Sequence, residues 1–131
     1  MSTNVATRPN RAPDRQVKVV TRPDQALLYR LCGDRNPLHA DLDVAKAAGF
    51  AMPILHGLCT YGICCRVVLS AFCDFDAARL TEFGVRFSAA VVPGDIILVK
   101  LWIDRGIVSF EADVPARGVT VIKGGRATIT S

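Results

Sequence analysis

Residues 33–39, with the sequence GDRNPLH, place a carboxylate, an amide and an imidazole close together in the chain. Asp34 and His39 are five positions apart, and Asn36 lies between them. Pro37 disfavours helical geometry at Asn36 and has no amide hydrogen to donate, so the segment is expected to form a shaped loop. A tight loop can bring the three polar side chains together.

Asp34 and His39 form a candidate acid/base pair for proton transfer with water. Imidazole titrates near neutrality, and a carboxyl group that is partly shielded from water can hold a proton at neutral pH. Asn36 is a candidate for orienting the water molecule or the carboxyl group. The spacing alone leaves a structural role open, because Asp and Asn are also common turn residues.

Helices are expected on both sides of this loop. A first short helix is predicted over residues 23–33, and a second over residues 41–48 with Asp41 or Asp43 as its cap. The longer segment Gly57–Phe72 is apolar on nearly every face, so its helix must be enclosed by other structure.

The remaining elements are predicted to be strands. Residues 16–21 are β-prone and are expected to begin the fold, after a flexible tail over residues 1–15. Alternation and turn residues predict strands at 81–92, 96–103, 107–114 and 119–130, with a bulge or bend at Gly124-Gly125. A chain of 131 residues accommodates one core. The predicted fold class is α+β, a single domain over residues 16–131 in which an antiparallel sheet wraps one long buried helix.

A family resemblance is carried by residues 29–39, YRLCGDRNPLH, followed by Ala45. They match, position for position, the hydratase 2 motif of MaoC-like (R)-specific enoyl-CoA hydratases. The likeness continues through residues 48–50, 53–62, 85–87 and 92–94, and it covers nearly everything after about residue 16. The chain therefore resembles the catalytic unit of that family. The resemblance implies a hot-dog fold, which is the arrangement that the periodicity also predicts.

The resemblance also implies an activity, the addition of water to a trans-2-enoyl-CoA to give the (R)-3-hydroxyacyl-CoA. Carried over to this chain, His39 would activate the water, Asp34 would protonate the α-carbon and Asn36 would hold the geometry. The amide of Gly57, at the start of the long helix, would donate to the thioester oxygen, where a helix N-terminus stabilises negative charge. His56 is expected to have a structural or loop-fixing role.

Two other readings stay open. A related hot-dog activity uses the same residues in reverse, to dehydrate 3-hydroxyacyl thioesters on an acyl carrier protein, and thioester hydrolysis is a further variant of it. A non-catalytic acyl-CoA-binding subunit is the other reading. The intact set of Asp34, Asn36 and His39 argues against it, because a scaffold has no need of a water-activating group.

No cofactor is expected, because water supplies both the α-proton and the hydroxyl group, and coenzyme A is part of the substrate. The five cysteines contain no CxxC pair and there are two histidines, so no metal site is predicted. Arg66, Arg86 and Lys100 are candidates for contacts with the CoA phosphates. Each is equally well explained as a surface charge.

The expected partners follow from the resemblance and the composition. The family's close relatives hold two hot-dog units in one chain and this sequence holds one, which implies a homodimer or a heteromer with a second unit. The net charge of +4 comes without a basic run among aromatics, so no nucleic-acid binding is predicted. No apolar stretch is long enough for a membrane span or a secretory signal, and a cytoplasmic protein is expected.

Overall fold

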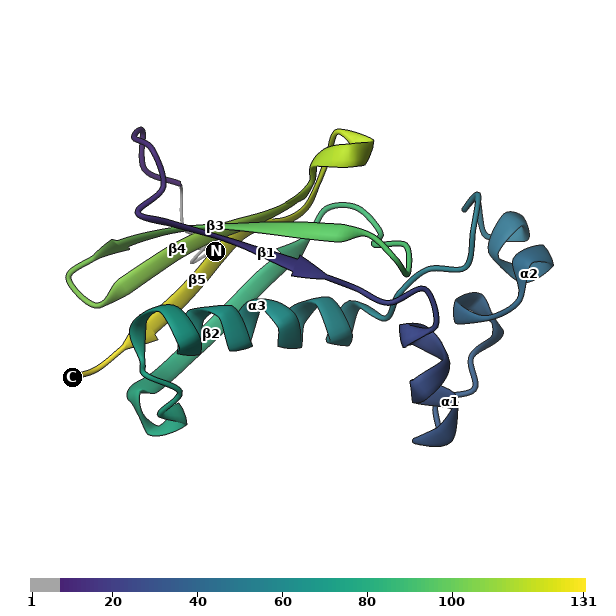
Figure 1. Cartoon of the computed structure of the whole chain (residues 1–131), viewed down its shortest axis with the longest axis horizontal. Helices are drawn as coiled ribbons and strands as arrows, with labels where there is room; N and C mark the ends of the chain where they lie inside the picture. Colours follow the sequence, from purple (N-terminus) through teal and green to yellow (C-terminus); the bar gives the residue numbers. More distant parts are fainter. Residues whose placement is uncertain (1–7) are drawn as a thin grey trace, which may run out of the picture.

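The computed structural model describes residues 8–131, in which one long helix lies against an antiparallel sheet (Figure 1). The strands are β1 (Arg15–Val20), β2 (Leu80–Phe87), β3 (Ile96–Asp104), β4 (Ile107–Val114) and β5 (Val119–Ile129). The helices are α1 (Leu28–Leu31), α2 (Leu42–Ala47) and α3 (Gly57–Phe72), and 3₁₀ turns lie at Gln25–Leu27, Pro37–His39, Ala77–Arg79 and Pro115–Arg117. The predicted α+β class is confirmed.

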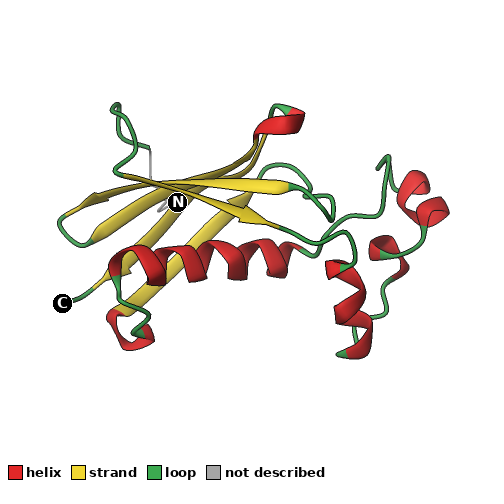
Figure 2. Ribbon diagram, viewed as in Figure 1, coloured by secondary structure: helices red, strands yellow, loops and turns green. Residues whose placement is uncertain are grey.

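The sheet has five strands in the order β1-β3-β4-β5-β2, and every neighbouring pair is antiparallel. The strands β3, β4 and β5 follow one another as hairpins, whereas β1 and β2 flank the helical region in sequence and occupy the two edges. Helix α3 lies along one face of the sheet (Figure 2). The segment with α1 and α2 extends beyond the N-terminal end of α3 (Figure 1).

The core lies between α3 and the central strands. On β4 the side chains of Val108, Phe110, Ala112 and Val114 are buried and alternate with more exposed ones, as the sequence alternation predicts. From α3, the core includes Cys64, whose thiol has its pKa raised to about 12 by burial. This cysteine therefore behaves as a small apolar side chain.

The sheet covers only one face of α3 within the single chain. Thr60, Cys64, Val67 and Val68 are its buried residues, whereas Leu58 is 71% exposed. The apolar sequence of this helix is thus more extensive than the surface that its own sheet can cover. In the part of the chain that the structure describes, no helix is long and apolar enough to cross a membrane.

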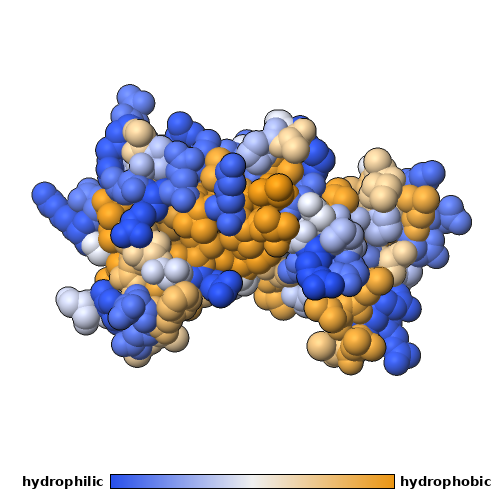
Figure 3. Space-filling view, in the orientation of Figure 1, coloured by the Kyte–Doolittle hydropathy of each residue, from blue (hydrophilic) through white to orange (hydrophobic). Residues whose placement is uncertain are grey.

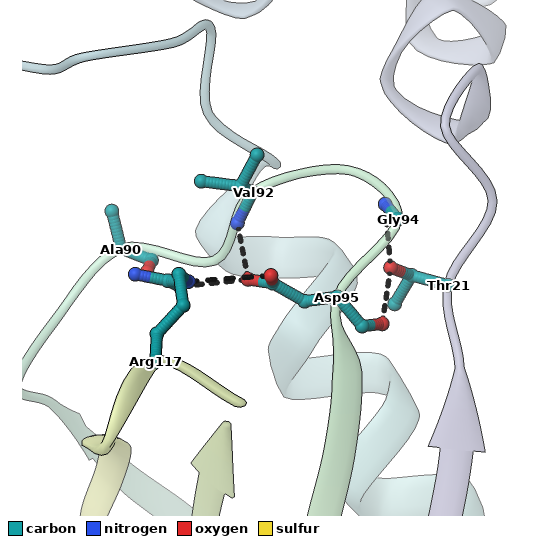
Figure 4. A network of polar contacts seen from close by, with 6 residues as sticks. All are labelled: Thr21, Ala90, Val92, Gly94, Asp95 and Arg117. Atoms are coloured by element: carbon teal, nitrogen blue, oxygen red, sulfur yellow. Dashed lines mark hydrogen bonds and ion pairs between the residues drawn. The ribbon is translucent and has the colours of Figure 1, made fainter. Parts of the chain in front are cut away.

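The strand predicted at residues 81–92 is shorter than expected, because β2 ends at Phe87 and a loop follows it. The cause lies in a tertiary contact. The carboxylate of Asp95 accepts hydrogen bonds from the Val92 N–H (2.8 Å) and from the Arg117 guanidinium (2.7 Å), which binds the last residue of the predicted strand to the turn before β3 (Figure 4). Sequence alternation could not reveal this competition.

The same network fastens the loop to two other parts of the fold (Figure 4). Arg117 also donates to the carbonyl of Ala90 at 2.9 Å, so the turn after β4 holds the loop from one side. Thr21, which follows β1, donates its hydroxyl to the Asp95 carbonyl at 2.7 Å and accepts from the Gly94 N–H at 2.9 Å. The loop is therefore fixed at both ends.

The predicted bulge in the last strand is confirmed. In the pairing of β2 with β5, Gly84 faces Arg126 and Arg86 faces Lys123, so β5 has one more residue than β2 over this stretch. Gly124 has φ 55°, in the left-handed region that favours glycine. The extra residue bends β5 where it passes over the core.

The N-terminal elements differ in detail from the prediction. The expected helix over residues 23–33 is divided into the 3₁₀ turn Gln25–Leu27 and the short α1. Of the tail predicted over residues 1–15, residues 1–7 lie outside the described part. The backbone carbonyl of Arg11 accepts a hydrogen bond from the Trp102 indole at 2.8 Å, and the Asp14 carboxylate accepts one from the Ile103 N–H at 2.8 Å, so residues 11–14 follow the edge of β3.

Candidate active site

The loop between α1 and α2 is shaped by its own polar side chains. The N–H of Asp34 donates to the carbonyl of Tyr29 at 2.8 Å, and the Asp34 Oδ1 accepts from the Asn36 N–H at 3.2 Å. Asn36 is the cap of the following 3₁₀ turn, since its Oδ1 accepts from the Leu38 N–H at 3.0 Å. The predicted loop is confirmed, and the Asn36 oxygen is used in building it.

The tautomer of His39 follows from one hydrogen bond. Its Nδ1 lies 2.8 Å from the carbonyl oxygen of Ile54, on the segment that leads into α3. A carbonyl oxygen only accepts, so Nδ1 carries the hydrogen in this contact and Nε2 is left with a free lone pair. The half-buried ring can therefore accept a proton at Nε2.

His56 is the residue that brings the two ends of the loop together. Its ring stacks on that of His39, with 3.6 Å between centroids, and on that of Tyr29, with 4.0 Å. Its Nε2 lies 3.4 Å from Oδ2 of Asp34. The predicted pair of Asp34 and His39 is thus gathered around one buried imidazole.

The surroundings of the stacked rings favour the uncharged forms of His56 and Tyr29. Burial lowers the pKa of His56, and the neighbouring His39 lowers it further, while the Asp34 carboxylate opposes both effects. Burial raises the pKa of Tyr29 to about 12, and the hydrogen bond with Cys59 adds to the rise. At neutral pH His56 is an uncharged imidazole and Tyr29 an uncharged phenol. Asp34, by contrast, has a half-exposed side chain.

Gly57 is the first residue of α3, directly after His56. Among the described residues no acceptor is hydrogen bonded to its N–H, which belongs to the unsatisfied first turn of the helix. A Cβ at this position would lie 3.3 Å from Cζ of Phe87, so the absence of a side chain keeps the space before this amide open. The partial positive charge of the helix N-terminus adds to its attraction for an anionic oxygen.

Gly57 also lines an apolar groove. It is lined by residues of the segment before α3, by Gly57 and Thr60, by Phe87 at the end of β2, and by Ala89, Ala90 and Val91 of the following loop. The Asp95 network fixes the loop that forms this wall. An extended apolar group can therefore lie along the groove with its polar end near Gly57.

The other charged candidates lie elsewhere. Lys100 is on β3 and forms an ion pair of 2.9 Å with Asp113. Arg66 lines a separate groove between β1 and α3, and Arg86 is on β2 opposite Lys123 of β5. Within residues 8–131, no cluster of three or more His, Cys, Asp or Glu could hold a metal ion.

Two features of the site were missed by reasoning from the sequence. The Ile54 carbonyl, which sets the tautomer of His39, belongs to the backbone and has no sequence signal. The place of His56 between Tyr29 and His39 joins segments that are far apart in sequence. Its only signal was that a histidine directly precedes Gly57.

Comparison with known proteins gives consistent matches in sequence. Residues 4–124 match the model of the MaoC like domain. The chain is 48% identical over 117 residues to enoyl-CoA hydratase ChsH3 of Mycobacterium tuberculosis, a match that covers 89% of this chain and 41% of that protein. It is 46% identical over 123 residues to peroxisomal multifunctional enzyme type 2 of Drosophila melanogaster, covering 94% of this chain and 21% of that protein.

Solved structures match as well. The full-length structure of the Drosophila enzyme superimposes with a TM-score of 0.91 at 44% identity, covering 96% of this chain and 24% of that one. The MaoC-like dehydratase from Phytophthora capsici gives a TM-score of 0.92 at 41% identity, covering 100% of this chain and 46% of that one. The chain spans less than half the length of each of these relatives. The sheet wrapped on α3, the loop motif and the family model agree, and the chain belongs to the family of MaoC-like domains and has its hot-dog fold.

Proposed function

We propose that this protein catalyses the hydration of trans-2-enoyl-CoA to (R)-3-hydroxyacyl-CoA. The observation that carries the proposal is the grouping of Asp34 and His39 around His56, immediately before the free amide of Gly57. The relatives named enoyl-CoA hydratase and peroxisomal multifunctional enzyme type 2 support it.

In the proposed mechanism His39 and Asp34 share the work on one water molecule. The Nε2 lone pair of His39 takes a proton from water while the oxygen adds to the β-carbon of the substrate. Asp34, as the general acid, gives a proton to the α-carbon. The hydrogen bond from Nδ1 to Ile54 orients the ring for this step. Return of the proton from His39 to Asp34 completes the cycle.

The amide of Gly57 stabilises the charge that develops on the substrate. Addition at the β-carbon places negative charge on the thioester oxygen, and a preorganised N–H at a helix N-terminus offsets it. The acyl chain would then follow the apolar groove past Phe87. Water supplies all the atoms added, so we propose that the reaction uses no cofactor and no metal.

The direct test is to incubate the purified protein with trans-2-butenoyl-CoA and trans-2-decenoyl-CoA. Loss of the conjugated double bond is followed by ultraviolet absorbance, and the stereochemistry of the product is determined. Formation of the (R)-alcohol supports the proposal and shows which chain length is preferred. A folded protein that turns over neither compound contradicts it.

Dehydration of a 3-hydroxyacyl thioester is the second candidate activity. It is favoured by the name of the Phytophthora relative, a MaoC-like dehydratase. The same residues serve hydration and dehydration, so the two activities are distinguished by their substrates. Faster turnover of a 3-hydroxyacyl group on acyl carrier protein than of enoyl-CoA supports the dehydratase. A non-catalytic acyl-CoA-binding role would leave both substrates unchanged.

We propose that the chain forms a homodimer that covers α1. The residues on and before this helix expose Leu27 (49%), Leu28 (56%) and Leu31 (85%), and Figure 3 shows hydrophobic surface gathered there. Exposed apolar patches of this kind mark interfaces. Because α1 leads directly into the Asp34 loop, a partner at this place would border the site. A second hot-dog chain is the alternative occupant.

Light scattering coupled to size exclusion tests the dimer. The wild-type chain is expected at twice its mass of 14.1 kDa, and Leu31→Lys is expected to shift it toward the monomer. Phe75→Lys is the matched control, since Phe75 is also exposed but lies after the opposite end of α3. A monomeric wild-type chain contradicts the homodimer and favours a missing second unit.

The cytoplasmic location remains a proposal. All five cysteines are free thiols in the structure, which suits a reducing compartment. The Drosophila relative is named as peroxisomal, so localisation of the tagged protein in its own cells must distinguish the two compartments.

A further inference from the structure

The buried ring of His56 has polar atoms that the mechanism above does not use. The side chain is 6% exposed, and among the described residues neither ring nitrogen has a hydrogen-bond partner. Buried polar groups in folded proteins nearly always have a partner, and one that lacks it needs a specific explanation. Oδ2 of Asp34, 3.4 Å from Nε2, is within a small side-chain adjustment of being that partner.

The stack determines which way the edge of this ring points. Tyr29 lies against one ring face at 4.0 Å and His39 against the other at 3.6 Å, with interplanar angles of 20° and 21°. Contacts on both faces prevent the imidazole from tilting away. Its Nε2 edge therefore stays directed at Asp34.

Burial keeps the ring of His56 neutral, since burial and the neighbouring His39 lower its pKa although the Asp34 carboxylate opposes them. The titratable groups that face it are Tyr29 of α1, Asp34 of the loop and His39 of the 3₁₀ turn. A positive charge on His56 would be buried, and it would lie against His39, the imidazole that takes up the proton from water. Tyr29, on the other face of the ring, remains an uncharged phenol. A neutral imidazole with its hydrogen on Nε2 can donate it to the Asp34 carboxyl group.

We propose that His56 is a positioning residue, whose neutral ring holds Oδ2 of Asp34 through Nε2 and so fixes the carboxyl group for proton transfer. The opposite oxygen, Oδ1, already accepts from the Asn36 N–H at 3.2 Å. Two donors on two oxygens fix the plane of a carboxyl group whose side chain is otherwise 48% exposed. This inference rests on the proposed function.

The substitution His56→Phe tests it, because phenylalanine keeps a ring in the stack and removes only the nitrogens. We expect kcat for enoyl-CoA hydration to fall by about tenfold to a hundredfold, the range for residues that orient a functional group. KM is expected to change less than about twofold, because His56 contacts Asp34 and not the substrate. The melting temperature of the His56→Phe protein should stay near that of the wild type. Unchanged kcat, or a loss that appears only in KM, overturns the inference.

A double-variant cycle separates positioning from a general structural effect. If His56 acts through Asp34, His56→Phe in the Asp34→Asn protein causes no further loss of kcat. Losses that multiply overturn the inference.

Nitrogen-15 NMR of the histidine rings gives a readout that needs neither activity nor a folded variant at position 56. We expect His56 to be the neutral tautomer with hydrogen on Nε2, and we expect that resonance to shift in Asp34→Asn. Hydrogen on Nδ1 instead, or no shift, overturns the inference. If the wild-type protein hydrates no enoyl-CoA, the proposed function fails, and the NMR result still decides whether His56 holds Asp34.

Discussion

At the scale of single residues, Asp34 and His39 are expected to carry the chemistry without holding the fold. Asp34 is half-exposed, and His39 makes its polar contact with a backbone carbonyl. Positioned acid and base groups contribute about a hundredfold or more to a rate. We therefore expect Asp34→Asn and His39→Ala each to lower kcat at least about a hundredfold, with circular dichroism and melting temperature near wild type. Near-normal turnover in either folded variant would remove that residue from the mechanism.

Gly57 allows its amide to be tested separately from its missing side chain. Gly57→Ala adds a Cβ that meets Phe87 at 3.3 Å, and Gly57→Pro adds the same Cβ with two further ring carbons and removes the N–H. Proline is tolerated at the first position of a helix, so both variants should fold. Loss of an oxyanion donor costs about 3 kcal/mol of transition-state stabilisation, roughly a hundredfold in kcat. Proline should therefore be worse than alanine by about that factor, and equal turnover of the two would argue against the oxyanion role.

His56 is expected to make stability depend on pH. Burial and His39 lower its pKa below the unfolded value of 6.5. As the pH falls below 6.5, the unfolded chain binds a proton that the folded ring does not, so the free energy of unfolding decreases, by at most about 1.4 kcal/mol per pH unit. Urea unfolding at several pH values in this range measures the slope. The slope should be smaller in His56→Phe, and identical slopes would show that another group is responsible.

At the scale of elements, the packing of β5 on the core is expected to depend on Gly125. A Cβ there would lie 2.5 Å from two ring carbons of the buried Phe110, which stacks on Phe83. Overpacking of a core costs about 1–3 kcal/mol, so Gly125→Ala should lower the free energy of unfolding by about that amount. Gly62→Ala is the matched control, because Gly62 lies in α3 with nothing near its missing side chain, and alanine is expected to stabilise the helix by about 0.5–1 kcal/mol.

The elements also show how far local patterns reach. Alternation predicted β4 well because its pattern has a direct physical cause, with one face on the core and one toward solvent. The predicted end of β2 was wrong, because Arg117 and Asp95 hold residues 90–92, which alternation alone assigns to a strand, in a loop. Apolar residues on nearly every face identified α3, yet they did not say that its own sheet covers only one face.

At the scale of the whole molecule, the proposed catalytic groups come from one chain. Asp34 and His39 both contact His56 within it, and Gly57 follows His56 directly. If the protein is a dimer, a mixture of Asp34→Asn and His39→Ala proteins should show no more turnover than the sum of the separate variants. Exchange of subunits is checked first by mass spectrometry of tagged chains. Recovery of about a quarter of wild-type turnover would place the pair across the interface.

The sequence by itself determined the fold class, the long helix, the loop that holds Asp34 and His39, and the family, because each depends on local patterns or on a contiguous motif. Only the tertiary structure decided that Nδ1 of His39 faces the Ile54 carbonyl, that His56 is stacked between Tyr29 and His39, and that Gly57 lines an apolar groove. These contacts join segments that are distant in the chain. The physical reason is that hydrogen bonding and stacking depend on the distance and orientation of groups in space, and no periodicity of the sequence records them.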